Sequence, residues 1–573
     1  MNTVDRSPTT PIPADCAGQD FYAQDRSLQD LLAIYLPAET RASLTPHYAR
    51  LGRLAGGRLD ALARLADRHP PVLHPRDRYG NNEDWIEYHP AYREIEQIAF
   101  ADFQFHAMAH RAGVLDQPSP LPAAAKYALQ YLFTQAEFGL MCPVSMTDTS
   151  IHLIRTFAGP ELQHYLLPRM LSADLATLWK GAQFMTERAG GSDVGAIETV
   201  AVRAGEDWHL TGSKWFNSHA DADVALTLAR PAGAPAGTRG LALFALPRRR
   251  RDGSRNAYRI VRLKDKLGTK SMASGEIDLD GAEAYLVGAP DAGLKQMLEQ
   301  VNRSRLSHGA RAAGMMRRCV NEALAAARGR RAFGSAVIDF PLMRRQVLKM
   351  LVPTEQALSM TFATADALDR GAMAELRILT GLLKLRACRD NVPVATGAME
   401  ARGGNGYIED YVTARLIRDA QVGLLWEGTS NINALDVIGR AVGRQGAQRA
   451  LGALLHRRLE EADALPAAFR ARLGATWDRA AAAAERVAGG GEALARTAAT
   501  GLYNAASAVL LGWEATRPGA DARRALLARC VLDHRLTARD PLAPEEAAWE
   551  RPAADLLLAP PAQAQDAIAP LLA

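Results

Sequence analysis

The spacing of apolar residues changes twice along this 573-residue chain, and that change limits the fold more than any single motif does. Between residues 27 and 178, apolar residues recur at helical intervals, as in Leu28, Leu31 and Leu32. Residues 181–290 instead form short extended runs that turn residues separate at the spacing of strands. Helical patterns then return. The sequence therefore predicts a mainly α protein with a central β domain.

Shifts in composition divide this predicted fold into parts. The start of the chain is rich in Pro, Thr and Asp, which is typical of a flexible terminus. Near its other end the helical pattern becomes rich in Ala and Arg. The predicted parts are a flexible N-terminal arm (1–20), an N-terminal helical domain (21–180), a β domain (181–290), a C-terminal helical bundle (291–440) and a helical extension (441–573).

Charge and cysteine usage argue against several classes of protein. A net charge of +5 is mild for this length, so it does not by itself predict a nucleic-acid partner. The five cysteines form no Cys-x-x-Cys pair, which indicates reduced thiols in a cytosolic protein. His106 and His110 lie four residues apart without a third ligand at fitting spacing, so we predict no metal site. Without a secretion signal or a run of 18 apolar residues, we expect a cytoplasmic protein that does not span a membrane.

One carboxylate stands out near the end of the predicted helical bundle. Glu427 follows Trp426 and precedes the small residues Gly428 and Thr429. A carboxylate beside apolar surface can accept a proton near neutral pH. The short polar residues after it can cap a helix and present backbone N–H groups to a ligand. This pattern predicts a catalytic base on a turn that opens a helix.

Other segments point in the same direction, although each also has a purely structural interpretation. Glycines in residues 184–193 let the backbone approach a flat or anionic ligand, or simply form a loop between domains. Phe216 and Ser218 face the same side if they lie on a strand, which suits the edge of a heteroaromatic ring or an ordinary half-buried strand. Arginines in residues 328–334 suit phosphate oxygens or a solvated helix end. Residues 266–274 and 399–407 are the remaining segments that indicate a ligand site.

In their order and spacing, these segments resemble the acyl-CoA dehydrogenase family over roughly residues 125–440. The resemblance implies a helical bundle, a β-barrel and a second helical bundle, with FAD as cofactor. Residues 68–73, 87–92 and 340–344, together with the long tail, are similar more narrowly to the alkylation-response (AidB-like) branch. That branch is tetrameric and is linked to DNA binding through its C-terminal helices, so a homotetramer and a double-stranded DNA partner are also implied.

The resemblance assigns roles to individual positions. It implies that Glu427 is the catalytic base and that Arg305 lies near the mouth of the active site. Contacts to the flavin ring are implied for Met185, Thr186, Phe216 and Ser218, and a contact to the FAD for Thr429. Contacts to the pyrophosphate are implied for Ser192, Glu400, Gly403 and Gly404, and contacts to the FAD of a neighbouring subunit for Arg330 and Phe333. Two positions depart from the family pattern, because Glu400 and Pro341 stand where the family has Gln.

Two functions follow as expectations. The first is dehydrogenation of an acyl-CoA, in which Glu427 removes the α proton and a hydride passes to flavin N5. The alternative is a flavin-containing DNA-binding protein that protects DNA from alkylation with little or no thioester turnover. If residues 521–539 form one helix, Arg524, Arg535 and Arg539 share a stripe that can contact DNA phosphates, or that is only a solvated face.

Overall fold

The structure is a computed structural model that describes residues 12–205, 207–560 and 562–572. Its first part is helical, and α5 and α6 form its buried centre because nearly all their residues are apolar or small. The main N-terminal helices are α1 (Arg26–Tyr35), α2 (Ala38–Gly56), α3 (Arg58–Arg68), α4 (Pro90–Glu96), α5 (Ala123–Thr134), α6 (Met141–Phe157) and α7 (Pro160–Met170).

Two features of this part correct the sequence prediction. The predicted N-terminal helical domain also contains strands, because an antiparallel hairpin of β1 (Val72–Arg76) and β2 (Asn82–Glu87) follows α3. The predicted flexible arm is wrong from residue 12 onward, because Cys16 is only 1% exposed and its backbone N–H donates to Glu322. Residues 1–11 of the arm lie outside the described part of the chain.

The central part is a seven-stranded sheet that closes on itself. β6 pairs with β4 and also with β7, so the order β6-β4-β5-β9-β7 forms a ring, while β3 joins β6 and β8 joins β9. This confirms the predicted β-barrel. Its strands are β3 (Gly181–Phe184), β4 (Val200–Ala204), β5 (Asp207–Ser218), β6 (Val224–Pro231), β7 (Ala242–Pro247), β8 (Tyr258–Leu263) and β9 (Ser274–Val287).

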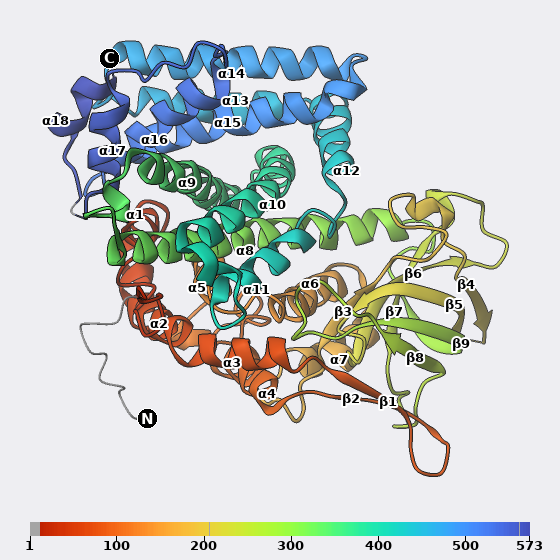
Figure 1. Cartoon of the computed structure of the whole chain (residues 1–573). Coiled ribbons are helices and arrows are strands. Elements are labelled where there is room, and N and C mark those ends of the chain that lie inside the picture. The colour runs from red at the N-terminus through yellow and green to blue at the C-terminus, as the bar shows by residue number, and fades with distance from the viewer. Residues whose placement is uncertain (1–11, 206, 561, 573) are drawn as a thin grey trace.

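The helix α8 (Gly293–Gly329) runs from the barrel across the centre of the molecule (Figure 1). It packs on α5, α9 (Pro341–Asp369) and α10 (Met373–Arg402). The approach is close at two glycines: a Cβ at Gly309 would lie 2.3 Å from Leu383, and one at Gly314 would lie 2.4 Å from the Tyr131 carbonyl oxygen. These contacts fix α8 between the two bundles. Its first turns therefore lie beside the barrel.

Further helices lie beyond this core, as the sequence predicts, and cover one side of the second bundle (Figure 1). No helix in the described ranges is both long and apolar enough to cross a membrane. After α11 (Val412–Val422) and α12 (Ser430–Leu435), the helices are α13 (Ala447–Glu460), α14 (Ala467–Ala488), α15 (Ala495–Glu514), α16 (Arg523–Val531), α17 (Glu550–Leu558) and α18 (Gln565–Ile568).

Candidate active site

Glu427 lies on a tight turn between α11 and α12. Its φ is +58° and that of Gly428 is +92°, a left-handed pair that costs free energy unless the surroundings hold it. Thr429 then caps α12, and its hydroxyl accepts from the N–H of Ile432. The predicted turn that opens a helix is therefore confirmed. The sequence did not indicate that α11 lies between the glycines of residues 403–406 and this turn.

Hydrogen bonds from three helices hold the turn. The Asn433 amide and the Lys384 ammonium donate to the Gly428 carbonyl, each at 2.6 Å. Arg305 donates to the Glu427 carbonyl at 3.2 Å and pairs with Asp436 at 2.8 Å. These hydrogen bonds to the backbone carbonyls stabilise the strained conformation of the turn, which keeps the site in one preorganised geometry.

Among the described residues, the Glu427 carboxylate itself has one hydrogen-bond donor. Ser304, in the first half of α8, donates to Oε1 at 2.7 Å. Backbone N–H groups on the same turn remain free: among the hydrogen bonds between described residues, none uses the N–H of Glu427. The turn thus presents an oriented carboxylate and an unused N–H donor together.

Lys384 is a buried cation beside this turn. Burial is the main cause that lowers its pKa, from 10.5 to about 8. Nearby Cys388 and Glu427 act in the opposite direction, because negative charge favours the ammonium form. The lysine therefore carries a charge at neutral pH that a moderate rise in pH removes.

Four of the predicted flavin-contacting residues lie together on the barrel. Met185 and Thr186 follow β3, and the Thr186 carbonyl accepts from the N–H of Trp215 at 2.8 Å, which places this loop against β5. Phe216 and Ser218 lie on β5, as predicted, and Phe216 is 59% exposed. An exposed aromatic ring beside a hydroxyl offers a surface for a flat ligand.

Cys142 connects this barrel face with Glu427. Cys142 packs with Met272 and with Trp426, the residue before Glu427, and Ser274, two residues after Met272, pairs with Ser218 across β5 and β9. Burial raises the pKa of Cys142, so the thiol stays protonated at neutral pH. The predicted base and the predicted ring-contacting strand therefore meet at one place.

A second group of predicted residues lies at the far end of α8. Arg330 ends this helix, and a Cβ at Gly403 would lie 3.0 Å from its guanidinium. Phe333 is 98% exposed, and Glu400 and Gly404 lie on the same exposed end. At about 1.5 Å per residue, the helix separates Ser304 from Arg330 by about 39 Å. Ser192 belongs to neither helix end and lies in an exposed loop after β3.

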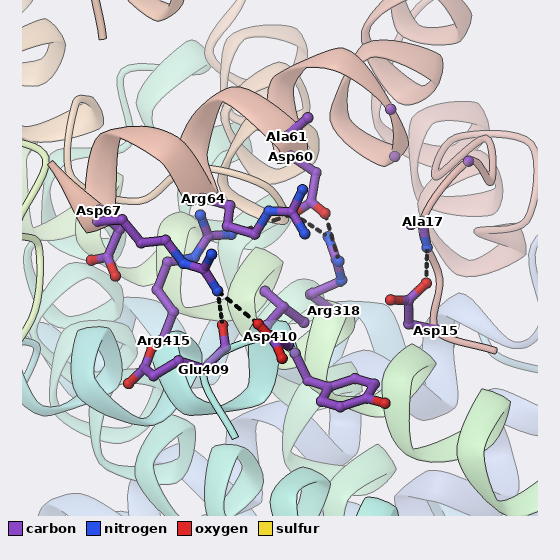
Figure 2. A pocket seen from close by; sticks show the side chains of 16 residues that line it. Asp15, Ala17, Asp60, Ala61, Arg64, Asp67, Arg318, Glu409, Asp410 and Arg415 are labelled. Carbon is purple, nitrogen blue, oxygen red and sulfur yellow. Dashed lines mark hydrogen bonds and ion pairs between the residues drawn. The ribbon is translucent and has the colours of Figure 1, made fainter. Parts of the chain in front are cut away.

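A separate pocket lies between α3, residues 15–18 and the segment before α11 (Figure 2). Its arginines and carboxylates neutralise one another, since Arg318 pairs with Asp60 at 3.1 Å and Arg68 pairs with Asp410 at 3.1 Å. Glu427 is absent from its lining. This pocket therefore has no contact with the candidate active site.

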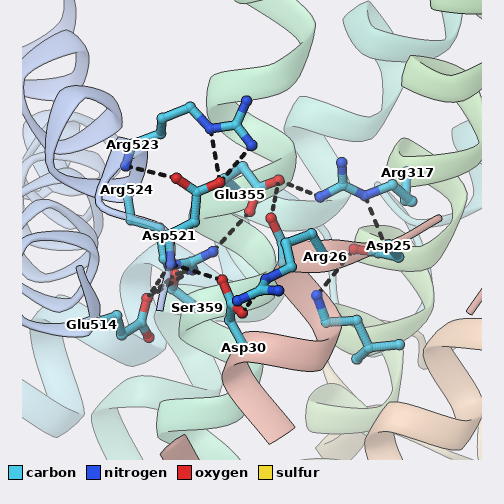
Figure 3. Close-up of polar contacts among 12 residues, drawn as sticks. Asp25, Arg26, Asp30, Arg317, Glu355, Ser359, Glu514, Asp521, Arg523 and Arg524 are labelled. Atoms are coloured by element: carbon cyan, nitrogen blue, oxygen red, sulfur yellow. Dashed lines mark hydrogen bonds and ion pairs between the residues drawn. The ribbon is translucent and has the colours of Figure 1, made fainter. Parts of the chain in front are cut away.

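The predicted DNA-contacting stripe is wrong. α16 and the helical turn after it end at Leu536, before Arg539. Arg524 is 2% exposed and pairs with Glu514 at 2.7 Å and Glu355 at 3.1 Å (Figure 3). Arg535 faces Asp390 at 3.5 Å and Arg539 pairs with Glu550 at 3.0 Å. The three guanidinium groups thus serve internal ion pairs and share no exposed face.

The sequence reasoning missed three buried residues near Glu427. His308 packs its ring 5.5 Å from that of Trp426, and Arg311 lies one turn further along α8. Together with Ser304 they follow the spacing i, i+4, i+7 of one helix face, so the sequence did carry a signal. Lys384 had a weaker signal, as a single cation within an apolar run of α10.

Comparison with known proteins identifies the same family as the sequence motifs do. Three family models match this chain: the adaptive response protein AidB N-terminal domain at residues 12–175, the acyl-CoA dehydrogenase middle domain at 182–282 and the acyl-CoA dehydrogenase C-terminal domain at 291–443. Acyl-CoA dehydrogenase family member 11 of Caenorhabditis elegans is 32% identical over 75% of this chain and 72% of its own length. AidB of Escherichia coli strain K12 is 34% identical over 66% and 70%, respectively.

Solved structures agree over nearly the whole length. ACDH-11 of C. elegans, in complex with C11-CoA, superposes with a TM-score of 0.84 at 28% identity and covers 94% of both chains. The apo form of Bd2924 superposes with a TM-score of 0.79 at 30% identity, over 88% of this chain and 99% of that one. The chain therefore belongs to the acyl-CoA dehydrogenase family, in the type represented by AidB and ACDH-11.

Proposed function

We propose that this protein is an FAD-dependent acyl-CoA dehydrogenase in which Glu427 removes the α proton of the acyl thioester. The observation that carries the proposal is the position of Glu427: Ser304 orients its carboxylate, and Cys142 packs with Trp426 and Met272, next to the strand pair that holds Ser218. A base fixed beside a surface for a flat ring is the arrangement that proton removal coupled to hydride loss requires.

The residues of the barrel face fit a flavin ring. Phe216 is an exposed aromatic surface, Ser218 offers a hydroxyl donor, and Thr186 lies against the same strand. When bound, FAD would supply the acceptor for the β hydride, which no side chain can provide. The chain itself then has to bind the thioester, orient it and take the proton.

The α C–H group is a very weak acid, so a carboxylate alone cannot remove its proton. Hydrogen bonds to the thioester carbonyl stabilise the negative charge that develops on its oxygen. The free backbone N–H of Glu427 is suited to this role, because the turn holds it next to the carboxylate that takes the proton. The left-handed conformation of Glu427 thus serves both tasks at once.

The far end of α8 supports an assembly of several copies. Arg330 and Gly403 lie about 39 Å along the helix from Ser304, which is longer than an extended FAD molecule. One chain therefore cannot use both groups of residues on a single FAD. A homotetramer, in which Arg330 and the exposed Phe333 reach the cofactor of a neighbour, gives the second group a function.

Anaerobic titration of the purified, FAD-loaded protein with a panel of acyl-CoAs tests the proposal. ACDH-11 in its complex binds C11-CoA, so the panel includes that chain length. We expect bleaching of the visible flavin band by at least one thioester. Glu427→Gln should keep FAD and slow the bleaching by about 10³-fold. Equal rates for the variant and the parent, or a protein that binds no FAD, would refute the assignment.

A further inference from the structure

Arg311 is a buried charge with too few partners. Its side chain is 1% exposed, and among the described residues its Nη1 atom has no hydrogen-bond partner. Its Nε donates to the Ser307 carbonyl at 3.4 Å, and its Cζ lies 5.5 Å from the centre of the Phe138 ring. Among the described residues it forms no ion pair. A buried guanidinium without a carboxylate is costly, so an arrangement of this kind calls for an anionic or polar ligand.

His308 repeats this pattern one turn earlier on α8. It is fully buried beside the rings of Phe138 and Trp426, and neither of its ring nitrogens has a partner within the described part of the chain. Burial, followed by the charges of Arg311 and Lys384, lowers the pKa of His308 well below 6.5, so the ring is neutral at pH 7. One nitrogen can then donate and the other can accept a hydrogen bond.

The place of these residues on α8 indicates which part of a substrate they face. Ser304 contacts the carboxylate of Glu427, and every residue from Ser304 to Val320 is buried. The backbone of Arg311 therefore lies about 10 Å further along the helix than that of Ser304, which contacts the base. An acyl chain whose thioester sits at Glu427 and whose free end follows α8 inward would meet His308 and then Arg311.

The groups that act on Arg311 bring little compensating charge. Among the described residues, Glu427 is the one carboxylate that acts on it, and no ion pair joins the two. Burial raises the pKa values of Cys142 and Cys388, so both thiols are neutral at pH 7, and His308 is neutral as well. The Arg311 guanidinium therefore has no paired carboxylate in the described part of the chain.

We infer that the site accepts acyl-CoAs whose acyl chain ends in a carboxylate, and that Arg311 and His308 bind that carboxylate. This inference rests on the proposed function and adds a substrate class to it. A guanidinium binds a carboxylate through paired N–H donors, which a hydrocarbon chain end cannot satisfy. Arg311 and His308 are thus specificity-determining residues.

Matched pairs of thioesters test the inference. The pairs are hexanoyl-CoA with adipoyl-CoA and octanoyl-CoA with suberoyl-CoA, and binding is measured by calorimetry on FAD-loaded Glu427→Gln, which does not depend on turnover. We expect the carboxylate-bearing member to bind at least about tenfold more tightly. Adding Arg311→Met should abolish the difference, whereas Arg311→Lys, which keeps the charge, should retain part of it.

The outcomes separate the two proposals. If the alkyl member of each pair binds equally well or better, ordered water satisfies Arg311 and the inference is wrong, while the dehydrogenase assignment stands. If the carboxylate member binds more tightly but bleaches no flavin in the parent protein, the inference holds and the dehydrogenase assignment fails. Urea unfolding of each variant shows whether a lost preference reflects a lost fold.

Discussion

Arg524 and Arg311 are both buried arginines in helical surroundings, but their partners differ completely. Arg524 contacts the carboxylates of Glu355 and Glu514 and the hydroxyl of Ser359 (Figure 3). Arg311 has no ion pair with any residue in the described ranges, and one of its terminal nitrogens has no partner. The first is enclosed by acceptors from α9 and α15, whereas the second lies by the Phe138 ring and near two neutral thiols, with Glu427 as the nearby carboxylate.

The difference distinguishes a buried charged side chain that stabilises the fold from one that is available to bind a ligand. A buried ion pair whose members are all satisfied connects elements, and Arg524 joins the extension to the central bundle in this way. An unpartnered buried charge has no such role, because its burial cost is not offset within the chain. We therefore expect changes at Arg524 to affect stability and changes at Arg311 to affect ligand binding.

Arg524→Met gives the largest expected change in stability. It leaves Glu514 and Glu355 buried without this cation, and breaking a buried pair typically costs about 3–5 kcal/mol. We expect the free energy of unfolding in urea to fall by about that amount, while the Kd for adipoyl-CoA stays unchanged in folded protein. A variant as stable as the parent would show that the network does not hold the extension, and would remove the basis of the comparison.

Lys384 is an intermediate case, with one carbonyl partner. Its pKa is about 8 in the fold against 10.5 in an exposed lysine, so between these values the unfolded chain binds more protons. The contribution of Lys384 to stability therefore rises as the pH increases from about 8 to about 10.5, by up to roughly 3 kcal/mol. Lys384→Met should remove this rise from the measured unfolding free energy.

The matched control for Lys384 is Lys295, which is exposed at the start of α8. Lys295→Met should leave the dependence on pH as it is in the parent. Lys266, whose pKa burial also lowers to about 8, is common to all three proteins and cancels in the difference. If parent and Lys384→Met respond identically to pH, the ammonium is paired or hydrated in a way that its single contact does not indicate.

Ser304 extends the comparison to a neutral donor. Its hydroxyl is the hydrogen-bond donor to the Glu427 carboxylate, so Ser304→Ala should leave that carboxylate poorly oriented. We expect kcat to fall about tenfold with little change in KM, because hydrogen bonds to charged groups contribute about 1.5–3 kcal/mol. Ser304→Thr, which keeps the hydroxyl, should recover most of the rate. A rise in KM alone would instead indicate a role in substrate binding.

The fold was predictable because it depends on periodicity. The change from helical to strand spacing at residue 181 coincides with β3, and its reversal near residue 292 coincides with α8. The turn at Glu427 was predictable for a similar reason, since small polar residues after an acid determine local backbone and capping. Such patterns determine local backbone structure, and that structure depends little on the tertiary structure around it.

Properties that depend on distant partners were not predictable. Helical spacing placed Arg524 on a stripe, but its carboxylates come from α9 and α15, so the stripe faces the interior. Arg311 and His308 share a face with Ser304 in the sequence, yet their lack of partners becomes visible only when the neighbouring helices are in place. Sequence patterns indicated which residues share a helix face. Only the packed structure showed which side chains contact that face.

Arg539→Met gives the smallest expected change and is the matched control for Arg524. Its side chain pairs with Glu550 at 3.0 Å but is 38% exposed, so water screens the pair and replaces it when the arginine is removed. The free energy of unfolding should change by less than about 0.5 kcal/mol. A loss as large as that of Arg524→Met would mean that the number of ion pairs, and not their burial, determines stability in the extension. Both arginines lie in the same terminal region, but Arg524 is buried with two carboxylates and Arg539 is partly exposed with one. The ratio of their effects therefore measures what burial and the second carboxylate contribute together.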